Sequence, residues 1–298
     1  MTAPRVLLLG GHGKVALHLT PLLLNRGWNV TSVVRNPEHE QDILRFNDHE
    51  GRASGGDRGG RGTVNVLVSS LDDVQNLADA ERVIEKVRPD YVVWAAGAGG
   101  KGGPARTYAV DQDAAKHFIR ASLADLNISK FLLISHLGSR RQRAPWWTDD
   151  DWAAVQRSWD AIPHYCKAKL EADEYFAAMA LKRKEKEREM GVGSGSGNGG
   201  FQGIVLRPGL LTLEPATRKV QLGKTKAGGS VTREDVAIVA DALLAREDTR
   251  GFLDLLGGED DVTEAVERVV TEKIDAIEGE DVEGITKRFQ GEPLEIKT

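Results

Sequence analysis

The stretch that most constrains the fold lies near the N-terminus. There the apolar run from Val6 to Leu9 is followed by Gly10-Gly11-His12-Gly13-Lys14-Val15-Ala16. This order is typical of a strand, a tight glycine turn and the start of a helix. Glycines permit positive φ and let a pyrophosphate approach the backbone, and the helix N-terminus offers unpaired N–H groups to the anion. The turn therefore predicts a nucleotide-binding α/β domain. The residues expected against the cofactor are Gly10, Gly11, His12, Gly13, Lys14 and Val15.

Strand-like and helical patterns alternate along the chain. Apolar runs predict strands at 5–9, 30–34, 64–68, 91–95, 130–135, 203–207 and 252–256. Helical spacing predicts helices at 14–25, 74–87, 111–124, 165–182, 232–245 and 261–277. Pro21 should remove a hydrogen bond within the first helix and kink it. Asp261 and Glu264 should open the last with a capping box. Buried strands separated by helices favour a parallel sheet covered on both faces. We expect one Rossmann-like, doubly wound α/β domain over residues 1–298, with a small C-terminal cap and helix after residue 209.

Two segments are too polar and too rich in glycine to pack in a core. They cover residues 47–63 and 183–200, the second opening on a charged run that ends at Glu189. Such composition is typical of surface loops. We expect both to be insertions into the domain.

Charge and cysteine content limit the class of protein. The chain carries 40 basic and 45 acidic residues, a formal net charge of −5, and a single cysteine, Cys166. This balance gives no reason to expect nucleic acid or an anionic membrane as partner, and one cysteine cannot form an intrachain disulfide. No cluster of His, Cys and carboxylate side chains has metal-ligand spacing. We expect a cytoplasmic monomer or homodimer that acts on a small molecule, without a metal.

The residue after the second predicted strand bears on the choice of cofactor. A carboxylate usually stands here to bind the ribose 2′-hydroxyl of NAD, but this chain has Arg35. A guanidinium would attract a 2′-phosphate, and Lys14 could add a second charge. This favours NADP(H), with NAD(H) as the alternative; Arg35 could also be an ordinary exposed arginine. Further candidates for cofactor binding follow the third and fourth strands: Asp72, Ala95, Ala96 and Gly97.

The clearest catalytic pattern is Tyr165-Cys166-Lys167-Ala168-Lys169. Tyr165 and Lys169 are four residues apart, so they share one face of a helix. A free phenol has a pKa of about 10, and a nearby ammonium favours the phenolate. We expect Lys169 to lower the pKa of Tyr165, so that the pair works as a general acid/base.

Together these motifs resemble the short-chain dehydrogenase/reductase superfamily, in particular its atypical, NAD(P)-binding NmrA/epimerase-like branch with small fungal members. The matching residues are Gly10, Gly13, Ala16, Asp72, Ala95 to Gly97, Tyr165, Lys169 and Arg207-Pro208-Gly209. The resemblance implies that the tyrosine exchanges a proton with a carbonyl group, that Lys169 also binds the nicotinamide ribose, and that Pro208 lies beside the cofactor. It implies an NADP(H)-dependent oxidoreductase. The alternatives are an epimerase or dehydratase that retains its cofactor, and a non-catalytic NADP(H)-binding redox sensor.

The remaining site residues are less sharply defined by the sequence. The family usually polarises the carbonyl with a serine or threonine, and here Ser135 and Ser139 are both candidates, with His136 between them as a substitute donor. Trp146 and Trp147, in an arginine-rich stretch, suit an anionic or aromatic substrate or else anchor their loop. Arg207 could contact the substrate or brace the sheet end.

Overall fold

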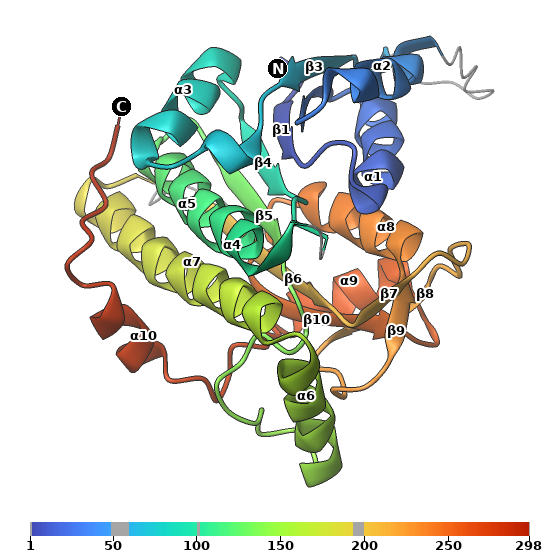
Figure 1. Ribbon diagram of the computed structural model, residues 1–298, viewed down its shortest axis with the longest axis vertical. Helices are drawn as coiled ribbons and strands as arrows, with labels where there is room; N and C mark the ends of the chain where they lie inside the picture. The colour runs from blue at the N-terminus through green and yellow to red at the C-terminus, as the bar shows by residue number, and fades with distance from the viewer. Residues whose placement is uncertain (1, 49–59, 100–101, 193–199, 298) are drawn as a thin grey trace.

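A parallel sheet forms the centre of the computed structural model, which describes residues 2–48, 60–99, 102–192 and 200–297 (Figure 1). Within these residues the sheet has nine strands in the order β11-β8-β10-β6-β5-β4-β1-β2-β3. Their bounds are β1 Arg5–Leu9, β2 Asn29–Val34, β3 Val64–Val68, β4 Tyr91–Trp94, β5 Lys130–Ile134, β6 Gln202–Pro208, β8 Lys219–Gly223, β10 Gly251–Gly257 and β11 Asp260–Asp261. Pairing is parallel from β3 across to β10, and β8 and β11 are added antiparallel.

The strand order reverses at β1, which lies between β4 and β2. In open parallel sheets the crevice for a ligand lies at such a reversal, outside the carboxyl ends of the strands. The predicted Rossmann-like, doubly wound fold is thereby confirmed. The carboxyl end of β1 is where the glycine turn begins.

Side chains along each strand point alternately to the two faces of the sheet. Both faces are apolar, and helices cover both. In β1, Val6 and Leu8 belong to one core and Leu7 and Leu9 to the other, and all four are fully buried. The first core is covered by α1 (Lys14–Asn25), α2 (Glu40–Asp48), α8 (Arg233–Leu244) and α9 (Val262–Thr271). The second is covered by α3 (Leu77–Val87), α5 (Ala115–Ala124), α7 (Pro163–Glu189) and α10 (Val282–Arg288) (Figure 1).

The chain after residue 209 does more than cap the domain. β10 enters the central sheet beside β6, and α8 and α9 cover one face. A separate two-stranded ribbon of β7 (Leu210–Thr212) and β9 (Ser230–Thr232) stands outside the sheet. This segment therefore adds strands β8, β10 and β11 to the sheet and two helices to one of its faces.

Parts of the two expected loop insertions are helical. Residues 183–189 form the last turns of α7, because Arg183 and Glu187 are buried and paired with each other at 2.7 Å. Asn47 belongs to α2; its amide nitrogen donates to the carbonyl of Val64, and its amide oxygen accepts the N–H of Val64. The glycine-rich stretches at 49–59 and 193–199 lie outside the described residues.

Some helix boundaries also differ from the expectation. The helix expected at 111–124 is preceded by α4 (Gly103–Thr107) and divided into a π-helical segment, η3 (Tyr108–Ala114), and α5. α9 ends at Thr271, and Asp261 caps it without a side-chain hydrogen bond, so the expected capping box is absent from this described helix. α1, in contrast, has the expected bounds, with Pro21 inside it. No described helix combines the length and the apolar character needed to span a bilayer.

Candidate cofactor and active site

The glycine turn is shaped to accept an anion. Gly10 has φ of 81°, and a Cβ there would lie 2.6 Å from the Cα of Ala96, so only glycine fits between β1 and the end of β4. The N–H of Gly11 donates to Val33 O at 2.9 Å, which ties the turn to the end of β2. α1 then starts with Gly13 as N-cap, with no side-chain cap and no acidic residue in its first turn. These N-terminal amides fit the pyrophosphate of a dinucleotide.

Arg35, expected to bind a 2′-phosphate, emerges directly after β2. Its side chain is 55% exposed and lies 3.5 Å from the Asp72 carboxylate in η2 (Leu71–Asp73), which also accepts from Arg106 at 2.8 Å. Partial burial acts to raise the pKa of Asp72, but Arg106, Ser70 and Arg35 outweigh it and hold that pKa below its usual value. Asp72 therefore stays ionised and competes with any anion for Arg35.

Tyr165 and Lys169 lie on α7, at the carboxyl ends of β4 and β5. The Lys169 ammonium forms an ion pair with Asp111 at 3.1 Å, and both side chains are almost fully buried. The carbonyls of Ala96 and Ile134, one from each strand end, are each 3.5 Å from Lys169 Nζ. The Tyr165 ring centroid is 5.8 Å from this ammonium. The ammonium thus lies between the tyrosine and the two strand ends.

Asp111 is a site residue that sequence reasoning missed. It comes from η3, its Oδ2 accepts the N–H of Ala98 at 2.8 Å, and a Cβ on Gly97 would lie 2.9 Å from its Oδ1. Asp111 therefore connects Lys169 to the glycine-containing segment after β4. Its importance could not be read from its neighbours in sequence, because Lys169 is 58 residues away.

The direction of the pKa shift at Tyr165 differs from the expectation. Burial raises the pKa of this phenol, and the opposing effect of Lys169 is the smaller one. Burial alone would lower the pKa of Lys169, but Asp111 and Tyr165 outweigh it and raise that pKa. Near neutral pH the pair is therefore a neutral phenol beside a cation. Tyr165 is prepared to donate a proton rather than to accept one.

The three candidates for polarising a carbonyl are close together but differ in exposure. Ser135 and Ser139 hydroxyls are 3.4 Å apart, with Ser139 fully buried and Ser135 nearly so. The His136 ring lies 5.5 Å from the Tyr165 ring, and its Nδ1 accepts the N–H of Gly138 at 3.2 Å. Burial, reinforced by Lys169, lowers the pKa of His136 to about 4. His136 is therefore neutral near pH 7 and is directly beside the tyrosine.

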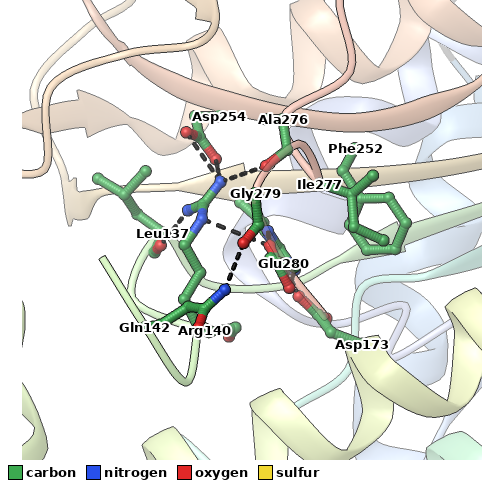
Figure 2. A network of polar contacts seen from close by, with 12 residues as sticks. Leu137, Arg140, Gln142, Asp173, Phe252, Asp254, Ala276, Ile277, Gly279 and Glu280 are labelled. Carbon is green, nitrogen blue, oxygen red and sulfur yellow. Dashed lines mark hydrogen bonds and ion pairs between the residues drawn. The ribbon is translucent and has the colours of Figure 1, made fainter. Parts of the chain in front are cut away.

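A buried ionic network underlies this site (Figure 2). Arg207 contacts Asp173 at 2.7 Å and Glu280 at 2.6 Å, and all three side chains are buried. Arg140 contacts Asp254 at 2.8 Å and Glu280 at 3.5 Å. We expected Arg207 either to contact substrate or to brace the sheet end. Its side chain is buried and bonded to two carboxylates at the end of β6. Asp173 could have been found on α7, where it follows Tyr165 and Lys169 at the same four-residue spacing.

Trp146 and Trp147 anchor the loop after β5. Both indole N–H groups donate to the carbonyl of Thr225, at 2.9 and 2.7 Å, and Arg140 lies over both rings. Pro208 ends β6, and its carbonyl accepts from Leu137 at 3.0 Å beside the serine candidates. In the described part of the chain, no three His, Cys, Asp or Glu residues are grouped to hold a metal ion.

Comparison with known proteins supports the class that this geometry indicates. No family model matches the chain. UPF0659 protein C216.03 of Schizosaccharomyces pombe is 30% identical over 231 residues, which cover 76% of this chain and 79% of that protein. A Bacillus subtilis protein named uncharacterized sugar epimerase YhfK is 24% identical over 89% of this chain and all of its own length. The solved structure of a putative NAD-dependent epimerase/dehydratase from Bacillus halodurans is 26% identical, with a TM-score of 0.63 over 89% of this chain and 100% of that one.

The fold and these relatives define an atypical, NAD(P)-binding member of the short-chain dehydrogenase/reductase superfamily, whose members are NAD(P)-dependent oxidoreductases and epimerases. The resemblance seen in the sequence is thus confirmed. Within this class, the chain belongs to the UPF0659 family.

Proposed function

We propose that the protein is an NADP(H)-dependent oxidoreductase that interconverts a small carbonyl compound and its alcohol. The observation that carries the proposal is the buried set of Tyr165, Lys169 and Asp111 at the strand ends beside the glycine turn. Arg35 after β2, in place of a carboxylate, supports NADP(H) over NAD(H).

The glycine turn and the first turn of α1 would hold the pyrophosphate, and Arg35 the 2′-phosphate. The cofactor, when bound, supplies the hydride-transferring nicotinamide C4. In the reducing direction Tyr165 donates its phenolic proton to the carbonyl oxygen, and the phenolate left behind is stabilised by the Lys169 cation. Asp111 holds that ammonium in place. In the oxidising direction Tyr165 must first lose its proton, so oxidation requires a higher pH than reduction.

Replacement of Tyr165 tests the catalytic part of the proposal. Tyr165→Phe keeps the ring and removes the proton, so turnover of NADPH with a panel of aldehydes and ketones should fall by roughly 10²- to 10⁴-fold. Calorimetric affinity for NADPH should stay within about twofold of wild type and exceed that for NADH. The matched control is Tyr175→Phe on the same helix, whose ring packs on Phe289 in the core and which should retain turnover. Unchanged turnover in Tyr165→Phe would exclude it as the proton donor.

An epimerase with retained cofactor is the second candidate, favoured by the name of the Bacillus subtilis relative. An epimerase returns the hydride to its own substrate, so no net oxidation of NADPH would be seen. Cofactor that remains bound through purification, together with exchange of substrate stereochemistry, would favour this reaction over the first.

A further inference from the structure

Two histidines stack on each other at the mouth of the glycine turn. The rings of His12 and His39 are 3.6 Å apart at their centroids and 7° from parallel. His12 belongs to the turn itself, and His39 ends the short helix η1 (Pro37–His39) that follows Arg35. The two rings therefore join the glycine turn to the segment that follows β2. The Gly11–Val33 hydrogen bond holds the same two segments together, and the adenosine of the cofactor is expected between them.

His12 also lies beside a carboxylate. Its Nε2 is 3.2 Å from the Asp42 carboxylate on α2. Two charged rings at stacking distance would repel each other unless an anion is present. Within the described residues the His39 ring makes no hydrogen bond, and it is only half-buried, so its nitrogens can reach a ligand.

Other charges around the pair do not supply that anion. Asp42 is shared with Arg45 at 3.3 Å, and Arg35 is shared with Asp72. The remaining charged groups on the adjoining elements are Lys14 of α1, Glu38 of η1, and Glu40 and Asp48 of α2. Arg35 and Lys14 make the region attractive to a phosphate.

We infer that His12 and His39 form a proton-linked part of the 2′-phosphate site, so that discrimination of NADP(H) from NAD(H) strengthens as the pH falls. Phosphate binding brings one additional proton onto the imidazole pair, and the charged ring then pairs with the phosphate oxygens. A ribose 2′-hydroxyl has no charge to pair, so NAD(H) binding takes up no such proton. The inference rests on the proposed NADP(H) function and extends it to residues on a second element.

Calorimetric titration of the full-length protein with NADP⁺ and with NAD⁺ at pH 6.5, 7.5 and 8.5 tests the inference. NADP⁺ should bind about fivefold more weakly at pH 8.5 than at 6.5, the order expected for one solvent-accessible ion pair, while NAD⁺ affinity stays within twofold. Protonation of the ligand's own phosphate, near pH 6, would act in the opposite direction. Titration at pH 7.5 in two buffers of different ionisation enthalpy should show net proton uptake with NADP⁺ only.

The variant His39→Phe keeps an aromatic ring against His12 but has no titratable nitrogen. Its NADP⁺ affinity should change by less than twofold over the same pH range. The control is His18→Phe, because His18 is exposed on α1; this variant should show the wild-type pH dependence. The inference is overturned if His39→Phe retains the wild-type pH dependence, or if the wild-type protein binds NADP⁺ without proton uptake. Binding of neither nucleotide would instead remove the proposed function, and the inference with it.

Discussion

The charge state of His136 depends strongly on folding. In the folded protein burial, together with the Lys169 and Arg207 cations, lowers its pKa to about 4. In the unfolded chain the ordinary histidine pKa of about 6.5 applies. Between these two values the unfolded state binds more protons than the folded state, so stability rises with pH across this window and is lost as the pH falls through it.

This difference predicts an acid sensitivity that one substitution removes. Wild-type protein should lose about 2 kcal/mol of unfolding free energy at pH 5 relative to pH 7.5 through His136 alone. His136→Gln cannot take up the proton, so its loss over the same interval should be smaller by about that amount. Urea unfolding at the two pH values measures the change in unfolding free energy of each protein, to which the carboxylates contribute equally. Equal changes in the two proteins would show that His136 is not held neutral by the fold.

Among the helices, α1 is destabilised by a proline in its interior. Pro21 lies inside it and has no N–H to donate to the carbonyl of Leu17, and proline in a helix interior is about 3 kcal/mol less favourable than alanine. Pro21→Ala should therefore raise the unfolding free energy by about 1–2 kcal/mol, after loss of the stiffness that proline gives the unfolded chain. Pro163→Ala is the control, because Pro163 stands in the first turn of α7, where the missing N–H costs nothing. Equal changes in urea unfolding for the two variants would contradict this account.

Elements with a strong local signal could be predicted, and elements defined by distant partners could not. Buried apolar runs placed β1 and β3 at their observed residues, and the glycine turn placed the start of α1. The charged residues 183–189 suggested a loop because nothing nearby shows that Arg183 would bond the carbonyls of Leu123 and Asp125. Asp111 was missed for the same reason: its partner Lys169 is brought to it only by the fold. The motif residues of the candidate site were therefore visible in the sequence, but their ionic partners were not.

In the whole molecule, the carboxylate of Glu280 joins the C-terminal segment to two arginines close to the candidate site. Glu280 joins Arg207 at the end of β6 and Arg140 in the loop after β5, and its side chain is only 8% exposed. Burial alone would lower the pKa of Arg207, but Glu280 and Asp173 outweigh it and raise that pKa. Two buried guanidinium groups thus contact a residue that lies more than 70 positions further along the chain.

Removal of that carboxylate should therefore destabilise the protein as a whole. Glu280→Gln keeps the shape of the side chain but leaves both arginines short of negative charge, at a cost of about 3 kcal/mol or more. The matched control is Glu278→Gln, two residues earlier, because Glu278 is 63% exposed and pairs with Lys224 at the surface, where such pairs contribute less than about 1 kcal/mol. Urea unfolding of the two variants measures the difference. A similar, small loss in both would mean that Arg207 and Arg140 are sufficiently neutralised by Asp173 and Asp254 alone, and that the C-terminal segment is held by its other contacts.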